Sequence, residues 1–211
     1  MVSSSPAILV LEDGRVFRGD AFGAIGETFG EAVFATGMSG YQETLTDPSY
    51  YRQVVIATAP HIGNTGWNDE DDESSRIWVA GYAVRDPSPR PSNWRSSRTL
   101  ESELVSQQIV GISGIDTRAL TRHLRERGSM RVGISSLSTD TDALLAKVLE
   151  QPAMEGADLV AMVTCAEPYV VPAQGEKRFT VAAVDLGIQS NTPRELRSEE
   201  RRVGKECRSR W

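Results

Sequence analysis

The chain has 211 residues, which is enough for one or two domains. Its hydrophobic fraction of 39% and charged fraction of 25% are ordinary for a globular protein, and no apolar run approaches the roughly 18 residues of a membrane-spanning helix. The formal charge of −6 argues against general nucleic-acid affinity, because such binding needs cations that neutralise phosphates.

The N-terminal segment is predicted to form a hairpin of two strands. Ala7 to Leu11 is a short apolar run that is typical of a buried strand. Asp13-Gly14 is the strongest hairpin signal in the chain, and the return strand is expected to begin at Val16.

Three glycines follow with the spacing G-x-x-G-x-x-x-G, which is not a phosphate-binding fingerprint and lacks a strand-to-helix context. We interpret them as turns in a loop that precedes a strand over 32–35. These glycines are Gly23, Gly26 and Gly30.

The stretch from Thr36 to Asn64 organises the rest of the chain. It opens with a corner of small residues, 37–40, which is followed by one predicted helical turn that Asp47-Pro48 stops. A strand over 54–59 is apolar without alternation, which suits a strand covered on both faces. A second tight corner at 60–64 completes a rigid rim of the kind on which binding groups are usually carried.

The next segments are predicted to be a loop, a strand and an irregular connection. The acidic run 68–75 lacks the ligand spacing of a calcium loop, so we expect a solvated loop there. Residues 77–84 are apolar on both faces and predict a covered strand, and prolines at 87, 89 and 91 mark the connection that follows.

Helices and strands alternate in the second half of the domain. Asp116 is expected to cap a helix that ends at Gly128. The other expected elements are helices over 99–107 and 140–149, strands over 109–112 and 132–135, and a weak helical turn over 158–163.

Four arginines lie on the helix between Asp116 and Gly128. A basic helix face is usually only solvated, but it is also suited to contact with an acidic partner surface. The residues are Arg118, Arg122, Arg125 and Arg127.

Several motifs of this sequence resemble the small chain of glutamine-dependent carbamoyl-phosphate synthetase. They are G-M-S-G-Y-Q-E-T-L-T-D-P-S-Y from residue 37, P-H-I-G-N from 60, D-E-D-D-E-S-S from 69, G-I-S-G-I-D-T-R-A-L-T-R-H-L-R-E-R-G from 111 and V-D-L-G-I-Q-S-N-T-P-R from 184. The resemblance covers nearly the whole chain and ends at about Arg194.

The resemblance implies an α/β fold: a mixed-sheet, swivelling β/β/α-type domain with flanking helices over residues 1–166. A linker over 167–178 and the first strand and loop of a truncated class I glutamine amidotransferase α/β domain over 179–196 are expected to follow. The strand itself is predicted over 179–184, where the chain is strongly apolar.

The last residues, 197–211, have no apolar periodicity and look like the in-frame translation of a sequencing adapter. We therefore expect an artefactual, disordered tail there, with a native basic tail as the alternative. The second cysteine, Cys207, falls in this segment.

In the family, a cysteine activated by histidine and glutamate hydrolyses glutamine in the second domain. Such a cysteine lies at a tight strand-to-helix turn, the nucleophile elbow, and is flanked by small residues. The sequence has no matching elbow, because Cys165 has Pro168 three residues after it and no flanking glycine. We therefore interpret Cys165 as a small buried or linker residue. His123 is expected to be exposed in its helix, and His61 to have a structural hydrogen-bonding role. No catalytic residue and no metal site are predicted, and the fragment alone is expected to be inactive.

One substrate-binding residue is implied by the resemblance. The family's L-T-D-P-S-Y serine reaches L-glutamine bound by the other domain, and Ser49 occupies that position. A hydroxyl can donate to the carboxylate of glutamine and accept from its ammonium group. The alternative is that Ser49 only bonds to the backbone of its own turn.

The resemblance further implies that the parent protein is a cytoplasmic enzyme that supplies ammonia from glutamine to the large subunit of the synthetase. The large subunit would carry ATP and a divalent metal and make carbamoyl phosphate from bicarbonate for arginine and pyrimidine synthesis. The absence of a secretory signal and of a disulfide framework agrees with that location. The alternative is a stand-alone swivelling module that interacts with other proteins or carries a phosphate on His61.

Overall fold

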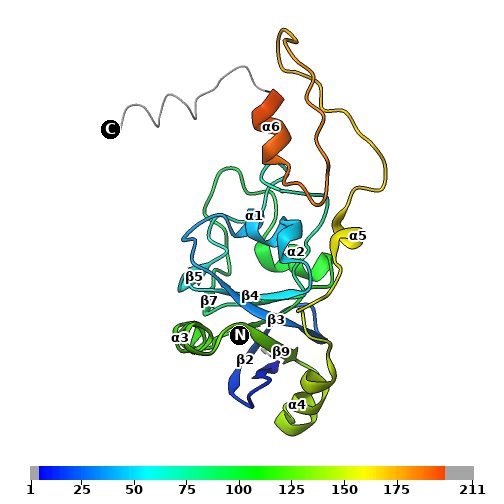
Figure 1. The fold of residues 1–211 in the computed structure, drawn as a ribbon. Coiled ribbons are helices and arrows are strands. Elements are labelled where there is room, and N and C mark those ends of the chain that lie inside the picture. The colour runs from blue at the N-terminus through cyan, green and yellow to red at the C-terminus, as the bar shows by residue number, and fades with distance from the viewer. Residues whose placement is uncertain (1–4, 198–211) are drawn as a thin grey trace, which may run out of the picture. The chain divides into compact units, whose positions relative to one another are not determined.

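The computed structural model describes residues 5–197, which fall into two compact units divided between Asp158 and Leu159 (Figure 1). The first unit holds all of the strands among the described residues, and the second holds two short helices. Within 5–197, no helix is both long enough and apolar enough to cross a membrane.

The first unit is built on a mixed sheet that closes on itself in the order β1-β2-β8-β6-β4-β3-β9. Neighbours from β3 through β4 and β6 to β8 are parallel, and the remaining pairs are antiparallel. The strands are β1 Pro6–Leu11, β2 Val16–Gly23, β3 Glu27–Ala35, β4 Gln53–Ala57, β6 Gly81–Ala83, β8 Val110–Ser113 and β9 Met130–Ser135. A mixed sheet was expected, but its closure was not predicted.

Short helices and a small second sheet surround the closed sheet. Figure 1 shows α1 and α2 on one side of it and α4 on the other. The elements are α1 Tyr41–Thr46, the 3-10 helix η1 Pro48–Tyr50, the paired strands β5 His61–Ile62 and β7 Asp86–Pro87, α2 Leu100–Ser106, α3 Thr117–Arg127 and α4 Thr141–Glu150.

Successive side chains of a strand point to opposite faces of the sheet, and this divides the core into one cluster inside the closed sheet and two clusters outside it. Val54 and Ile56 on β4 belong to the inner cluster, which receives residues from all seven strands of the closed sheet and is completed by Leu120 and Leu124 of α3. Val55, between them, packs outward with the residues of α1 and α2. Burying each such aliphatic side chain contributes about 1.5–3 kcal/mol.

The predicted cap of α3 is confirmed, and the structure adds a cap of the same kind on α4 that was not predicted. The Asp116 side chain accepts a hydrogen bond from the Ala119 amide, and the α3 helix ends at Gly128 with φ of 92°. Asp140 caps α4 in the same way, by accepting from the amides of Asp142 and Ala143. These caps satisfy amide groups that have no partner inside the helix.

Three expectations for the first unit need correction. Gly23 and Gly30 do not lie in a loop, because Gly23 is the last residue of β2 and β3 begins at Glu27 and runs through Gly30. The strand expected over 77–84 is only three residues long, Gly81–Ala83, since the residues before it form only an isolated bridge at Val79 and a bend at Ala80. The acidic run 68–75 is a loop but is not fully solvated: Glu73 is buried.

The second unit contains α5 Val160–Val163 and α6 Asn191–Arg197. The strand expected over 179–184 is wrong: these residues form no strand, and Phe179, Val181 and Val184 are exposed. An apolar run becomes a strand only when a neighbouring strand takes up its backbone groups, and the described part of the second unit offers none. Arg197 ends α6, and the rest of the predicted tail lies outside the described residues.

Candidate functional site

The sequence-predicted site residue, Ser49, lies in a turn held by two buried neighbours. The α1 helix ends at Thr46, and Asp47 is extended, with φ of −77° and ψ of 119°. Pro48 then begins η1, and the Asp47 carboxylate accepts the Ser49 amide at 2.8 Å. Because Asp47 and Pro48 are both buried, they fix the backbone from which Ser49 projects.

The Ser49 side chain itself is exposed. Within the part of the chain that the structure describes, its hydroxyl forms no hydrogen bond, so it is not engaged by its own turn. The turn therefore presents a hydroxyl that can both donate and accept toward a ligand from outside the unit.

The acidic loop is tied to this turn by hydrogen bonds that the sequence did not predict. The Thr46 hydroxyl donates to the Gln42 carbonyl at 2.8 Å and accepts the Glu73 amide at 2.9 Å. The Ser74 hydroxyl donates to the Thr46 carbonyl at 2.6 Å. The loop therefore buttresses the end of α1, directly before the turn that carries Ser49.

Burial changes the acidity of two carboxyls beside this frame. The pKa of Glu43 is raised by burial and also by the charges of Asp71 and Glu73. The pKa of Asp72 is raised by burial, although the hydrogen bond from Gln42 opposes the change. In both cases desolvation disfavours the charged carboxylate.

Aromatic residues follow Ser49 on the same segment. The ring of Tyr51 meets that of Trp78 edge-on, with the centroids 5.7 Å apart, and the Arg76 guanidinium lies 3.9 Å from the Trp78 ring centre. Arg52 adopts a left-handed backbone with φ of 63°, which is uncommon for a residue other than glycine. The segment after Ser49 is thus held by ring packing as well as by the sheet.

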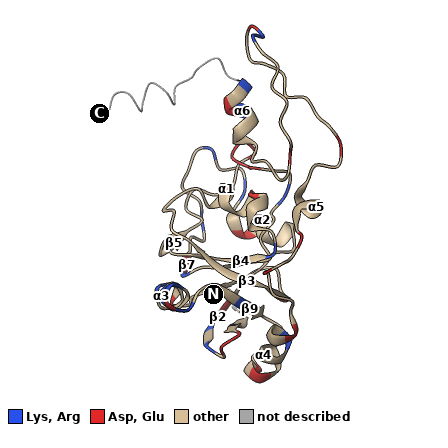
Figure 2. Ribbon diagram, in the orientation of Figure 1, with Lys and Arg blue, Asp and Glu red and all other residues tan. Residues whose placement is uncertain are grey.

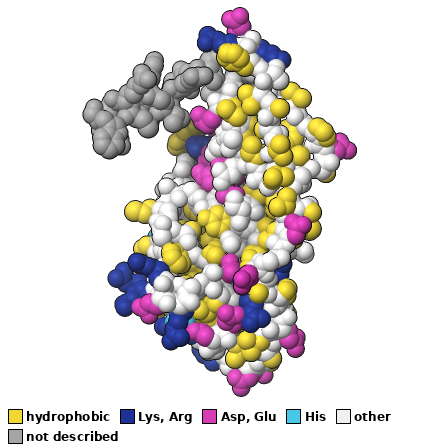
Figure 3. Space-filling model, in the orientation of Figure 1, with side chains coloured by type: hydrophobic (Ala, Val, Ile, Leu, Met, Phe, Trp, Pro, Cys, Tyr) yellow, Lys and Arg dark blue, Asp and Glu magenta, His cyan; other side chains and the backbone are white. Residues whose placement is uncertain are grey.

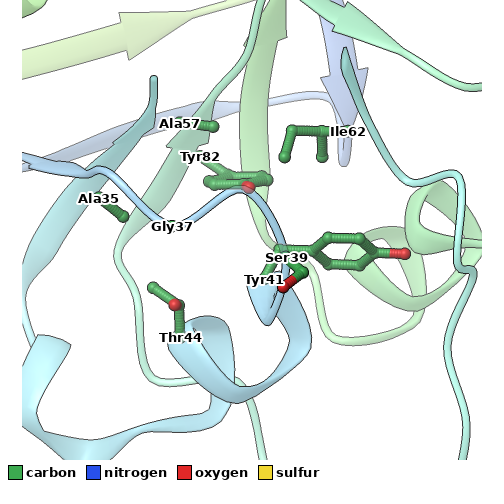
Figure 4. Close-up of a pocket in the computed structure, with 8 residues that line it drawn as sticks. All are labelled: Ala35, Gly37, Ser39, Tyr41, Thr44, Ala57, Ile62 and Tyr82. Carbon is green, nitrogen blue, oxygen red and sulfur yellow. The ribbon is translucent and has the colours of Figure 1, made fainter. Parts of the chain in front are cut away.

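A small cavity lies under the small-residue corner, separate from Ser49 (Figure 4). Its wall is mostly apolar, with hydroxyl groups from Ser39, Thr44 and two tyrosines. The lining residues are Ala35, Gly37, Ser39, Tyr41, Thr44, Ala57, Ile62 and Tyr82.

The two tyrosines of this cavity differ in their hydrogen bonding. The Tyr41 hydroxyl donates to the Gly66 carbonyl and accepts from the Thr65 hydroxyl at 2.9 Å. Tyr82 is only 2% exposed, and its hydroxyl has no hydrogen-bond partner in residues 5–197. Burial raises the pKa of Tyr82, so this phenol stays protonated.

The two histidines are not brought together with Ser49. His61 is exposed, and its Nδ1 lies 3.0 Å from Asp86 Oδ2, which agrees with the expected hydrogen-bonding role. The expected exposure of His123 is wrong, because its side chain is only 11% exposed between Asp13 and Arg15. Since the Arg15 guanidinium can only donate to Nδ1, the proton lies on Nε2, which donates to Asp13.

Cys165 was expected to be either a small buried residue or a linker residue. It is exposed, so the first alternative is wrong, and it belongs to the second unit. Nothing in the described residues places a histidine beside it. In the same part of the chain, no group of three or more His, Cys, Asp or Glu side chains has an arrangement that could hold a metal ion.

Comparison with known proteins identifies relatives over this region. The family profile described as carbamoyl-phosphate synthase small chain, CPSase domain, matches residues 9–134. The chain is 69% identical to the carbamoyl phosphate synthase small chain of Streptomyces coelicolor over 194 residues, which are 91% of this chain and 51% of that relative.

Relatives from other bacteria give the same picture. The small chain of Mycobacterium tuberculosis is 67% identical over 198 residues, and that of Corynebacterium diphtheriae is 59% identical over 195 residues. Each match covers 90% of this chain and 52% of the relative. The chain thus spans about half the length of the curated relatives it matches.

Proposed function

The chain belongs to the carbamoyl-phosphate synthase small-chain family, and from this we propose that it is the N-terminal part of a small subunit that supplies ammonia from glutamine to a large subunit. The observation that carries the proposal to the residue level is the exposed, unbonded Ser49 hydroxyl on a turn fixed by Asp47 and Pro48. In this proposal the domain closes one side of the glutamine site and docks onto the large subunit.

The glutamine-hydrolysing half of the site is proposed to lie in the part of the relatives that this chain does not span. Hydrolysis needs a thiolate, a base beside it and donors for the oxyanion. Neither Cys165 nor the histidines of the described residues supply that combination. The chain by itself is therefore proposed to release no ammonia from glutamine.

The finer parts of the proposal rest on family membership. ATP and a divalent metal belong to the large subunit, which uses bicarbonate and ammonia to make carbamoyl phosphate for arginine and pyrimidine synthesis. The swivelling character of the domain, its continuation into an amidotransferase domain and a cytoplasmic location belong to the same proposal.

The test of Ser49 uses a chimera in which residues 1–194 of this chain are joined to the remaining half of the Streptomyces coelicolor relative. Ser49→Ala should raise the KM for glutamine about 5-fold or more, because roughly 1 kcal/mol is lost when a ligand's polar groups lose one hydrogen bond. The measurement is steady-state ammonia release at varied glutamine concentration.

Ser106→Ala is the matched control, since Ser106 is an exposed serine of α2 whose hydroxyl bonds only its own helix. Its KM should equal that of the unchanged chimera. An unaltered KM in Ser49→Ala, with an active chimera, would remove Ser49 from the glutamine site.

The phosphate-carrier alternative has one favourable observation. The Nδ1 of His61 faces Asp86, while Nε2 has no partner within residues 5–197 and the side chain is exposed. Family membership supports the small-subunit proposal instead. Phosphate incorporation that His61→Ala abolishes would favour the carrier function.

A further inference from the structure

Three arginines of α3 form a stripe along one side of the helix. Arg118, Arg122 and Arg125 are spaced by four and three residues, and such positions lie above one another on a helix surface. All three are exposed. Figure 2 shows the basic residues along α3, and Figure 3 shows a dark-blue patch where this helix lies.

The opposite side of the helix anchors the stripe. Thr117, Leu120 and Leu124 are buried, and the last two belong to the inner core of the closed sheet. Together with the Asp116 cap, this packing fixes which way the arginines face. The α3 arginine stripe, Arg118, Arg122 and Arg125, is thus a rigid row of positive charges.

No carboxylate in residues 5–197 forms an ion pair with the stripe. Glu126 lies four residues after Arg122, but no ion pair joins them. Some cations elsewhere in the described residues do form ion pairs, such as Arg98 with Asp69 and Glu103, and Lys147 with Glu27.

The repulsion between neighbouring arginines costs the helix stability, and only Arg125, in the last turn, is favoured by the helix dipole. Like charges four residues apart destabilise a helix by about 0.2–0.5 kcal/mol. The stripe also stands out from a chain with a net charge of −6. Positive charge gathered in one place on an acidic protein is suited to steering toward, and orienting on, a negatively charged surface.

We infer that the α3 arginine stripe docks this domain onto an acidic face of the large subunit, formed by Asp and Glu carboxylates. The inference rests on the proposed function, because it takes the large subunit as the occupant. Protein is favoured over nucleic acid because the acidic body of the chain would repel a phosphate backbone beyond the stripe.

The test variant is Arg118→Glu combined with Arg125→Glu. Glutamates at these positions flank Arg122 at distances of four and three residues, so they form helix-stabilising pairs. The helix dipole favours the glutamate at 118 in the first turn, and this gain offsets the loss at 125, in the last turn, where the dipole favours a positive charge. The variant should therefore keep its circular dichroism spectrum and melting temperature while the sign of the stripe is reversed.

The matched control is Lys177→Glu combined with Arg178→Glu, which makes the same change in net charge on exposed residues of the second unit. Binding of each chain to a purified large subunit of carbamoyl-phosphate synthase is measured by biolayer interferometry at low and physiological salt. The stripe variant should bind about 10- to 100-fold more weakly, mainly through slower association and with a shallower salt dependence, while the control changes less than about 3-fold.

The outcomes separate this inference from the proposed function. Equal affinity of the stripe variant and the unchanged chain, or equal weakening by the control, would overturn the stripe while leaving the small-subunit function intact. Absence of any binding by the unchanged chain would overturn both. Binding of a DNA duplex that only the stripe variant loses would assign the arginines to nucleic acid and overturn the inference.

Discussion

Tyr41 and Tyr82 border the same cavity, but their hydroxyl groups have opposite energetic roles. Tyr41 bridges Gly66 and Thr65, so its hydroxyl ties the residues just after the second corner to α1. The Tyr82 hydroxyl forms no hydrogen bond among the described residues and borders the cavity, so no protein partner offsets the hydration that it loses on burial.

We therefore expect Tyr82→Phe to leave the free energy of unfolding unchanged or to raise it by up to about 1 kcal/mol. Tyr41→Phe, the matched control, should lower it by about 1–3 kcal/mol, because the Gly66 carbonyl and the Thr65 hydroxyl lose a partner. Urea denaturation of the three proteins provides the comparison. A clear loss of stability in Tyr82→Phe would mean that its hydroxyl is engaged, for example by an ordered water in the cavity.

For single residues, the sequence predicted a side chain that bonds to its near neighbours in the chain and missed those that bond to residues far away in the chain. Asp116 was predicted as a cap because it acts on the helix that directly follows it, so its role depends only on neighbouring residues. The contacts of His123 with Asp13 and Arg15 join residues more than 100 positions apart. The pairing of Thr46 with Glu73 and Ser74 escaped prediction for the same reason.

Among the elements, β3 shows how packing can override a local signal. Gly30 was expected in a loop because glycine weakens strands, yet a Cβ atom there would lie 2.5 Å from the Arg52 carbonyl oxygen and 3.2 Å from the Ala80 Cβ. The glycine lets β3 approach β4 at the point where the Arg52 carbonyl accepts the Glu31 amide at 3.1 Å. A close backbone approach of this kind has no signature in a single sequence.

Gly30→Ala should therefore lower the free energy of unfolding by about 1–3 kcal/mol, since the added methyl group meets a backbone oxygen that cannot move aside. Gly26→Ala is the control, because its Cβ would meet only the end of the Val110 side chain, at 3.1 Å. It should cost less than about 1 kcal/mol. Thermal denaturation followed by circular dichroism checks both, and equal melting temperatures would contradict the close approach of β3 and β4.

At the scale of the molecule, the sequence predicted a mixed α/β domain but not its closure. The run 54–57 indicated a strand covered on both faces, and the structure places one face inside the closed sheet and the other under α1 and α2. Closure requires the pairing of β9 with both β1 and β3, and such long-range partners are not encoded in periodicity.

The second unit lacks what stabilises the first. No residue in 159–197 is buried, whereas the first unit holds three buried apolar clusters. Apolar side chains that remain exposed there, such as Phe179 and Val184, contribute no burial energy. Residues 179–184 therefore have the composition of a core strand but lack the partner strands that a core strand needs.

A chain that ends at Asp158 should consequently melt within about 2 °C of the full-length chain, because no residue in the described part of the removed segment, 159–197, is buried. It should also aggregate less on heating, since exposed apolar segments are removed.

A chain that ends at Ser138 is the control, because it lacks α4. Leu144 and Val148 of that helix are buried, and Leu144 packs against Ile8 and Val10 of β1. Losing that burial, about 3–6 kcal/mol, should lower the melting temperature by roughly 10 °C or more. If the chain ending at Asp158 melted as low as the control, residues 159–211 would carry stabilising contacts, and the independence of the first unit would be refuted.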